Sequence, residues 1–213
     1  MTDHIRIFPV LPSTNETAKQ AARAGAPDGE IVAALAQTAG RGQGDHTFFS
    51  PPDTGLYVSR IVRLPLPVGD AVRITTASAV AAVRAIRRAT GVQCAVKWIN
   101  DILLDGRKVA GILTESASDA DGMLSWAVVG IGINVYPPAG GFPPEIAGTA
   151  AALLPARGNS PDVREALLRA LAEEFTAVLP SVASGAYVPE YLRLCGTGKE
   201  KAEQALVGNA GKK

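Results

Sequence analysis

The stretch Cys94–Ser116, "CAVKWINDILLDGRKVAGILTES", decides the fold. Two apolar runs in it are joined by Asp105 and Gly106, a dipeptide typical of a tight β-hairpin because both positions tolerate positive φ. Residues 124–136, "LSWAVVGIGINVY", predict a further buried strand. Three more strands are predicted nearer the N-terminus, in "IRIFPVL", "GEIVAALAQ" and "TGLYVSRIVRL". The hairpin therefore predicts a sheet, to which the other strands are added.

Three helices are predicted between and after these strands. The first lies in "PSTNETAKQAARAGA", where Ser13 and Glu16 have capping-box spacing. The second covers residues 68–90 and ends at a glycine, and it is the central packing helix of an α/β layer. The third begins with Ser160 as N-cap and Pro161 at the first helical position. Residues 137–160, rich in Pro and Gly, predict a long surface connection with one short helical piece.

Composition limits the functional classes. Charged residues make up 19% of the 213 residues, with 21 Lys and Arg against 20 Asp and Glu, so neither a nucleic-acid interface nor an acidic tail is indicated. Cys94 and Cys195 are far apart and have neither disulfide-framework nor zinc spacing. No secretory signal and no apolar run of roughly 18 residues is present. We therefore expect a soluble, cytoplasmic protein that is not bound to membranes.

Residues 36–49, "AQTAGRGQGDHTFF", place three glycines around Arg41. Glycines let backbone N–H groups approach an anion closely, and the arginine adds a positive charge. The pattern matches neither a Walker A loop nor a dinucleotide fingerprint, so a plain surface turn is the alternative. Phe48 and Phe49 offer an apolar wall for a flat ligand, although we expect at least one of the two rings to pack into the core.

Other polar residues have two interpretations each. Asn100 and Asp101 could bind Mg²⁺ through oxygen or order a loop by side-chain hydrogen bonds. Asn134 could read an adenine edge, while the glycines before it could simply permit close strand packing. Lys108 is either an ammonium facing whatever approaches Gly111 or a solvated lysine on an edge strand.

Four separated segments together resemble the catalytic domain of biotin protein ligases. They are "STN" (13–15), "QTAGRG" (37–42) followed by "FFSP", "KWINDILLDGRKVAGILTE" (97–115) and "VVGIGINV" (128–135). The resemblance covers roughly residues 7–194. It implies an α/β fold of the α+β type, with a mixed, largely antiparallel central sheet flanked by helices. It also implies a catalytic domain over residues 1–194, with residues 195–213 as a short tail where the family usually has an SH3-like domain.

The resemblance implies the activity of a biotin–[acetyl-CoA-carboxylase] ligase. Biotin and ATP, with Mg²⁺, would form biotinyl-5′-AMP and pyrophosphate, and the biotinyl group would pass to a lysine of a biotin carboxyl carrier domain. No N-terminal winged helix precedes the first motif, so no DNA binding is expected. A homodimer is left open.

The resemblance assigns roles to particular residues. Arg41 and Lys108 are implied to be catalytic. The residues implied to bind biotin are Ser13, Thr14, Asn15, Gln37, Arg41, Gly42, Gln43, Lys108 and Gly111. Those implied to bind the nucleotide are Gly40, Arg41, Gly42, Phe48, Asn100, Lys108 and Asn134. Asp101 is implied to contact the metal that accompanies ATP.

The glycine loop departs from the family pattern G-R-G-R-x-G-R. Gln43, Asp45 and His46 stand at the second arginine, the following glycine and the third arginine. We therefore hypothesise weaker retention of biotinyl-AMP. Two alternatives are a lipoate or octanoate ligase or transferase of the same superfamily, and a non-catalytic biotin- or nucleotide-binding module.

Overall fold

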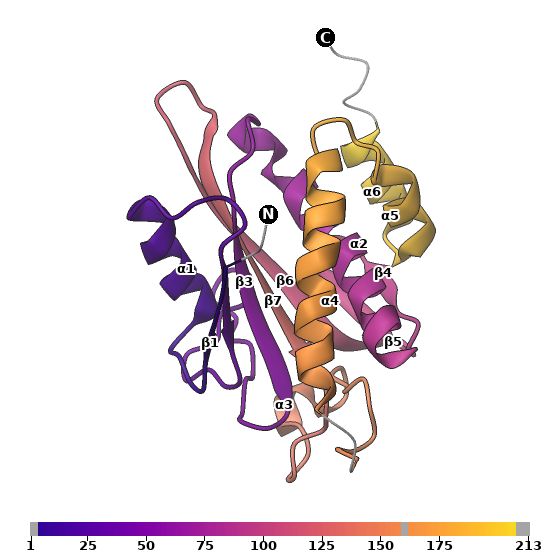
Figure 1. Ribbon diagram of the computed structural model, residues 1–213. Coiled ribbons are helices and arrows are strands. Elements are labelled where there is room, and N and C mark those ends of the chain that lie inside the picture. Colours follow the sequence, from indigo (N-terminus) through magenta and orange to yellow (C-terminus); the bar gives the residue numbers. More distant parts are fainter. Residues whose placement is uncertain (1–3, 159–161, 208–213) are drawn as a thin grey trace.

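One mixed sheet of eight strands runs through the molecule, in the order β1-β2-β3-β7-β6-β5-β4-β8 (Figure 1). The structure is a computed structural model that describes residues 4–158 and 162–207. The strands are β1 (Ile5–Phe8), β2 (Ile31–Ala34), β3 (Gly55–Val62), β4 (Ala95–Lys97), β5 (Asp101–Leu104), β6 (Arg107–Ser118), β7 (Leu124–Asn134) and β8 (Cys195–Thr197). The β1–β2 and β4–β8 pairs are parallel, and the other neighbouring pairs are antiparallel. The predicted mixed, largely antiparallel sheet is therefore confirmed.

The hairpin that decides the fold joins β5 to β6. Asp105 and Gly106 form its turn with φ of 49° and 78°, which is the positive-φ geometry that a tight hairpin turn requires. Strand β6 continues far beyond its partner and pairs along most of its length with β7. The hairpin thus brings Asp101, at the start of β5, opposite Gly111 in β6.

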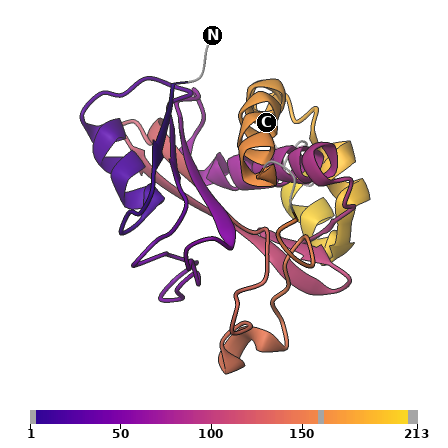
Figure 2. The ribbon, with the colours of Figure 1, turned by 60° about the horizontal axis from the view of Figure 1, so that its bottom comes forward.

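Helices cover the two faces of the sheet unequally (Figures 1 and 2). They are α1 (Thr14–Arg23), α2 (Ala71–Thr90), α3 (Pro144–Ala147), α4 (Val163–Val178), α5 (Val188–Leu194) and α6 (Lys199–Leu206), with 3₁₀ turns η1 (Val68–Asp70) and η2 (Leu179–Ser181). The long α2 is buried over most of its Ala- and Val-rich middle, as expected for a helix that lies between a sheet and a second helix, α4. Helix α1 lies on the opposite face.

Strand β7 shows how the alternation of a strand divides these two faces. Val129, Ile131 and Ile133 point into the main core under α2 and α4. Gly130 and Gly132 alternate with them and therefore point to the other face. Because glycine has no side chain, other side chains can approach the backbone of β7 closely on this face.

The predicted helix ends are partly corrected by the structure. Ser13 is the N-cap residue of α1 but makes no side-chain capping bond. Glu16 does not complete a capping box, because its carboxylate is engaged by Lys19 and an arginine of the glycine loop. Ser160 and Pro161, the predicted start of the third helix, lie outside the described residues, and Asp162 caps α4 by accepting from the Arg164 N–H at 3.1 Å.

The C-terminal segment packs with the rest of the chain. Strand β8 pairs with β4, and α6 buries Ala202 and Leu206 in the main core. Residues 208–213 of the predicted tail lie outside the described residues, and the assignment of residues 1–194 as the catalytic domain stays a prediction. Within residues 4–158 and 162–207, none of the helices combines the length and apolar character that crossing a membrane requires.

Candidate active site

A pocket opens on the face of the sheet that α2 and α4 leave free. The glycine loop, the start of α1 and strands β3, β5, β6 and β7 contribute to its walls. The residues predicted to bind ligand that line it are Ser13, Thr14, Asn15, Gln37, Arg41, Gly42, Gln43, Phe48, Asn100, Asp101, Lys108 and Gly111. Segments separated by up to about a hundred residues thus meet at one place, although the role of each residue stays a prediction.

The first turn of α1 fixes the orientation of Gln37 at one end of the pocket. The Thr14 N–H donates to Gln37 Oε1 at 2.8 Å, and the Thr14 hydroxyl donates to the same oxygen at 3.2 Å. Gln37 Nε2 therefore faces the other way and donates to Ser50 Oγ at 3.1 Å. Since a backbone N–H can only donate, the Gln37 amide is assigned without ambiguity. One Nε2 hydrogen remains for a ligand.

Ser59 of β3 forms the buried floor beneath Thr14 and Asn15. Its hydroxyl lies 2.6 Å from Asn15 Oδ1 and 2.8 Å from Thr14 Oγ1, and the residue is fully buried. Sequence reasoning missed Ser59. A small polar residue in the middle of a strand whose other residues are mostly apolar is the signal that could have found it.

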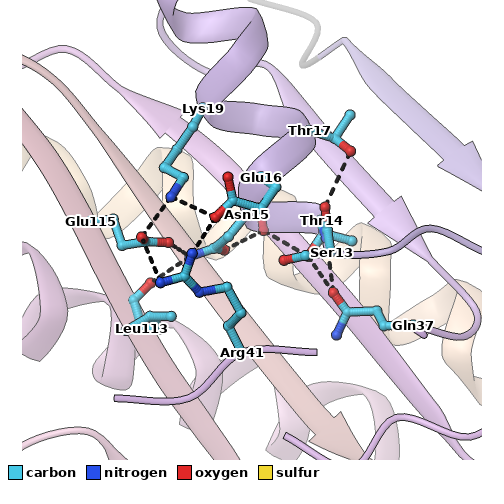
Figure 3. A network of polar contacts seen from close by, with 11 residues as sticks. Ser13, Thr14, Asn15, Glu16, Thr17, Lys19, Gln37, Arg41, Leu113 and Glu115 are labelled. Atoms are coloured by element: carbon cyan, nitrogen blue, oxygen red, sulfur yellow. Dashed lines mark hydrogen bonds and ion pairs between the residues drawn. The ribbon is translucent and has the colours of Figure 1, made fainter. Parts of the chain in front are cut away.

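A cluster of four charged side chains joins α1, the glycine loop and β6 (Figure 3). Arg41 was predicted to meet phosphate, but here its guanidinium contacts Glu16 and lies 3.8 Å from Glu115. Lys19 is paired with both carboxylates, at 2.7 Å each. The hydrogen bond from Lys19, together with Arg41, holds the pKa of Glu16 below its ordinary value. Of this cluster the sequence had indicated only Arg41, because ion pairing between distant segments leaves no local pattern.

Lys108 and Asp101 meet on the opposite side of the pocket. The Lys108 ammonium lies 2.5 Å from an Asp101 carboxylate oxygen and 5.9 Å from the centre of the Phe48 ring. A Cβ on Gly111 would lie 2.9 Å from Lys108 Cε, so the missing side chain makes room for the lysine. Strand β6 lies between β5 and β7, so the expectation of an edge strand is wrong, while the Lys108 side chain remains 36% exposed.

Asn100 orders the backbone beside this pair. Its Nδ2 donates to the Ile112 carbonyl at 2.8 Å, and the Ile112 N–H donates to the Asn100 carbonyl at 2.9 Å. Among the residues that the structure describes, no group of three or more His, Cys, Asp or Glu side chains could hold a metal ion. A Mg²⁺ carried by nucleotide phosphates needs only one or two protein carboxylates. Asp101 fits that requirement, and its metal role stays a prediction.

The two phenylalanines of the loop do not enter the core, contrary to the expectation for at least one of them. Phe48 packs against the backbone of β7, where a Cβ on Gly132 would lie 2.6 Å from its ring, and Phe49 is 39% exposed. The reason is the glycine strand, which accepts an aromatic ring on the outer face of the sheet. Gly40 permits the same approach, since its Cβ would lie 2.4 Å from the Phe48 carbonyl.

Beyond Phe48 a second hollow adjoins the pocket. Phe48, Lys108 and Asn134 line it together with Ile146, just before the end of α3. Asn134 Nδ2 donates to the Ala151 carbonyl at 3.1 Å, which also ties the connection after β7 to the sheet. A ligand with a polar head in the first pocket and a flat ring in the second would pass over Lys108.

Comparisons with known proteins agree with this geometry. Residues 7–134 match the model of the biotin/lipoate A/B protein ligase family. The bifunctional ligase/repressor BirA of Bacillus subtilis is 40% identical over 162 residues, which are 76% of this chain and 50% of that protein. The biotin–[acetyl-CoA-carboxylase] ligase of Paracoccus denitrificans is 40% identical over 121 residues, which are 53% of this chain and 48% of that one. The chain thus spans about half the length of these curated relatives.

Solved structures show the same fold. Biotin protein ligase from Aquifex aeolicus, in complex with biotin and ATP, superimposes with a TM-score of 0.71 at 22% identity, covering 91% of this chain and 78% of that one. Biotin acetyl coenzyme A carboxylase synthetase from Helicobacter pylori, with bound biotinylated ATP, gives a TM-score of 0.60 at 21% identity, covering 89% and 82%. The sheet order and its helices are therefore those of a known architecture.

Proposed function

The chain belongs to the biotin/lipoate A/B protein ligase family, and from that premise we propose that it is an ATP-dependent biotin–protein ligase. A biotin carboxylate oxygen attacks the α-phosphorus of ATP, and the bond to pyrophosphate breaks. The amine of an acceptor lysine then attacks the acyl carbon of biotinyl-5′-AMP, AMP leaves, and the lysine proton passes to solvent. The acceptor is the biotin carboxyl carrier domain of a carboxylase.

One observation carries this proposal: a pocket with amide groups at one end and cations at the other. Biotin has a compact ureido ring that both donates and accepts hydrogen bonds, followed by an apolar tail. Gln37 presents an N–H donor beside Ser13, Thr14 and Asn15, which suits that ring. Gly42 and Gly111 line the wall between the two ends of the pocket, along which the tail would lie.

The cations lie where the reaction develops negative charge. Attack on the α-phosphate puts charge on equatorial oxygens, and oriented cations and N–H groups stabilise it. Lys108 is already fixed between the pocket and the second hollow by Asp101 and Phe48. Arg41 reaches the phosphate by exchanging its contact with Glu16 for the ligand. Gly40 and Gly42 supply backbone close to the same point.

The second hollow is proposed to take the adenine. Phe48 offers a ring face, and Asn134 supplies an amide at its rim. Asn100 and Asp101 border the triphosphate, and Asp101 would share the Mg²⁺ with phosphate oxygens. With the phosphates in place, Lys108 lies between biotin and the nucleotide, which is where a catalytic cation is needed.

No side chain is proposed as a general base for the second step. The mixed anhydride is already activated, so the acceptor lysine needs only to arrive deprotonated. The near-neutral net charge of +1 supports a protein acceptor and no DNA. Two buried, unpaired thiols support a reducing, cytoplasmic setting.

ATP–pyrophosphate exchange tests the proposal directly. We expect exchange that depends on biotin and that octanoate or lipoate does not support. We also expect transfer of labelled biotin to a biotinyl domain and none to a lipoyl domain. Exchange with octanoate instead of biotin would point to the lipoate branch of the family. Biotin binding with no exchange at all would point to a binding module.

A further inference from the structure

Glu115 lies beside the pocket without lining it, and it joins two parts of the charged cluster (Figure 3). We propose that Glu115 is a positioning residue for biotin recognition, acting through the side chain of Asn15. This inference rests on the proposed function, because it concerns the same pocket. It concerns a residue that touches neither proposed substrate.

Each carboxylate oxygen of Glu115 has a different partner. Oε2 accepts from Asn15 Nδ2 at 2.9 Å, and Oε1 accepts from the Lys19 ammonium at 2.7 Å. Lys19 is itself buried, with 8% of its surface exposed. A buried ammonium requires charged partners, and its ion pair with Glu115 holds that carboxylate in place.

The Glu115 carboxylate selects one orientation of the Asn15 amide, together with the weaker acceptor Leu113, whose carbonyl lies 3.4 Å from Asn15 Nδ2. A carboxylate only accepts hydrogen bonds, so the NH₂ group of Asn15 must point toward it. Asn15 Oδ1 then points toward Ser59, whose hydroxyl lies 2.6 Å away. In the reversed amide, the oxygen would face a carboxylate and the NH₂ group would lose its charged acceptor.

The sheet prevents Asn15 from escaping this constraint. A Cβ on Gly130 would lie 1.9 Å from Asn15 Oδ1, so the amide rests directly on the backbone of β7. The Ser59 hydroxyl lies between Asn15 Oδ1 and Thr14 Oγ1, and Thr14 Oγ1 in turn lies 3.2 Å from Gln37 Oε1. The orientation set by Glu115 thus extends to the end of the pocket that reads the ureido ring.

Glu115→Gln tests the inference, because it keeps the shape and removes the charge. Lys19 draws the amide oxygen of the new side chain, which turns its NH₂ group toward the NH₂ group of Asn15. We expect this unfavourable contact to displace the Asn15 amide and the biotin Kd, measured by calorimetry without ATP, to rise about tenfold. The ATP Kd stays within about twofold, whereas a general structural defect would weaken both ligands.

Glu30→Gln is the matched control. Glu30 pairs with Arg6 at 2.5 Å, and its side chain is 15% exposed against 21% for Glu115. The control removes the charge of a paired carboxylate of similar burial away from the pocket, so the biotin Kd stays within about twofold. In the double variant Lys19→Met with Glu115→Gln, no ammonium competes for the amide oxygen. Because this variant has no buried ammonium at position 19, we expect its biotin Kd to return to within about threefold of the native value.

A double-mutant cycle with Asn15→Ala shows whether Glu115 acts through Asn15. In the Asn15→Ala background, Glu115→Gln changes the biotin Kd by less than about twofold. An equal loss in both backgrounds would overturn the inference, as would native-like biotin affinity in a folded Glu115→Gln protein. If the native chain binds no biotin, the proposed function and this inference both fail. If the native chain binds biotin and the variants do not differ, only the inference fails.

Discussion

Individual residues in the glycine loop determine how tightly the proposed intermediate is held. Gln43 and His46 line the pocket where the family has arginines. The remaining loop arginine, Arg41, interacts with Glu16 and Glu115. The loop therefore brings less positive charge to an acyl-phosphate than the family pattern would.

Gln43→Arg adds a charged donor at the pocket wall. We expect biotinyl-AMP to dissociate about five- to tenfold more slowly, because a charge-assisted hydrogen bond to phosphate is stronger than a neutral one. The measurement is the release rate of labelled biotinyl-AMP after rapid dilution. Gln93→Arg, at an exposed position away from the pocket, is the control. Equal release rates for the native protein and Gln43→Arg would refute the hypothesis.

The sequence predicted a large part of the pocket but little of its support. Motif residues such as Thr14, Gln37 and Lys108 do converge, because they lie at the start of α1, after the end of β2 and at the start of β6. Ser59 and Glu115 were missed, since each acts through Asn15 from 44 and 100 residues away. The pairing of charges over such separations depends on strand register, which no local pattern specifies.

Among the elements, β7 contributes most directly to the site. Its glycines support the Asn15 amide and the Phe48 ring, while its isoleucines fill the core. The same alternation explains why the expectation of a buried phenylalanine was wrong. An aromatic ring next to a glycine-lined strand has a binding surface outside the core.

Gly132→Ala tests the contact between β7 and Phe48. The new methyl group would lie 2.6 Å from the ring, so Phe48 must move and the wall of the second hollow is lost. We expect the ATP Kd to rise about tenfold, while the biotin Kd changes less than threefold. Gly69→Ala, where a Cβ would have nothing within 4 Å, should change neither. An unchanged ATP Kd would remove Phe48 from the proposed nucleotide site.

The packing of the C-terminal helix α6 could not be predicted from the sequence. Its eight residues, "KEKAEQAL", carry few apolar side chains, so no periodic pattern indicates that they pack. Ala202 and Leu206 nevertheless join the core beneath α5 and β8. Tertiary contacts decide the structure of such a short segment.

Leu206→Ala measures how much helix α6 contributes to the stability of the domain. Leu206 is 3% exposed, so the truncation should lower the free energy of unfolding by about 2–4 kcal/mol in urea titrations. Val207→Ala, at a residue that is 52% exposed, should change it by less than about 0.5 kcal/mol. Similar small effects for both would mean that residues 199–206 contribute little to the folded domain.

At the scale of the whole molecule, the fold follows from the hairpin and from one helix with a long apolar run. The antiparallel neighbours of β6 and the packing of α2 were predictable, because hairpin turns and helical periodicity are local. The two parallel pairs, β1–β2 and β4–β8, were not. Each requires a connection whose path is set by the packing of helices on the sheet.

A buried thiol makes the stability of the native fold decrease at alkaline pH. Burial raises the pKa of the Cys94 thiol to about 11, so the unfolded chain loses this proton at lower pH than the native protein does. The contribution of the protonated Cys94 thiol to the free energy of unfolding is fully present below the ordinary thiol pKa. It is lost as the pH rises toward 11.

We expect the native protein to lose stability between about pH 8.5 and 10.5 relative to Cys94→Ala, by up to about 2–3 kcal/mol. Urea titrations of both proteins across this range give the comparison, and the other titrating groups are the same in each. Parallel pH curves for the two proteins would show that Cys94 does not contribute to the decline.

The alternation of β7 ties the pocket to the core in a way that limits how this sequence can change. A shift of one residue along the strand would place isoleucines in the ligand space and glycines under α2. Such a slip would close the pocket and leave cavities in the core at once. A change of register in β7 would therefore abolish binding and destabilise the fold together. Insertions and deletions in β7 should for this reason be far less tolerated than substitutions at the pocket rim.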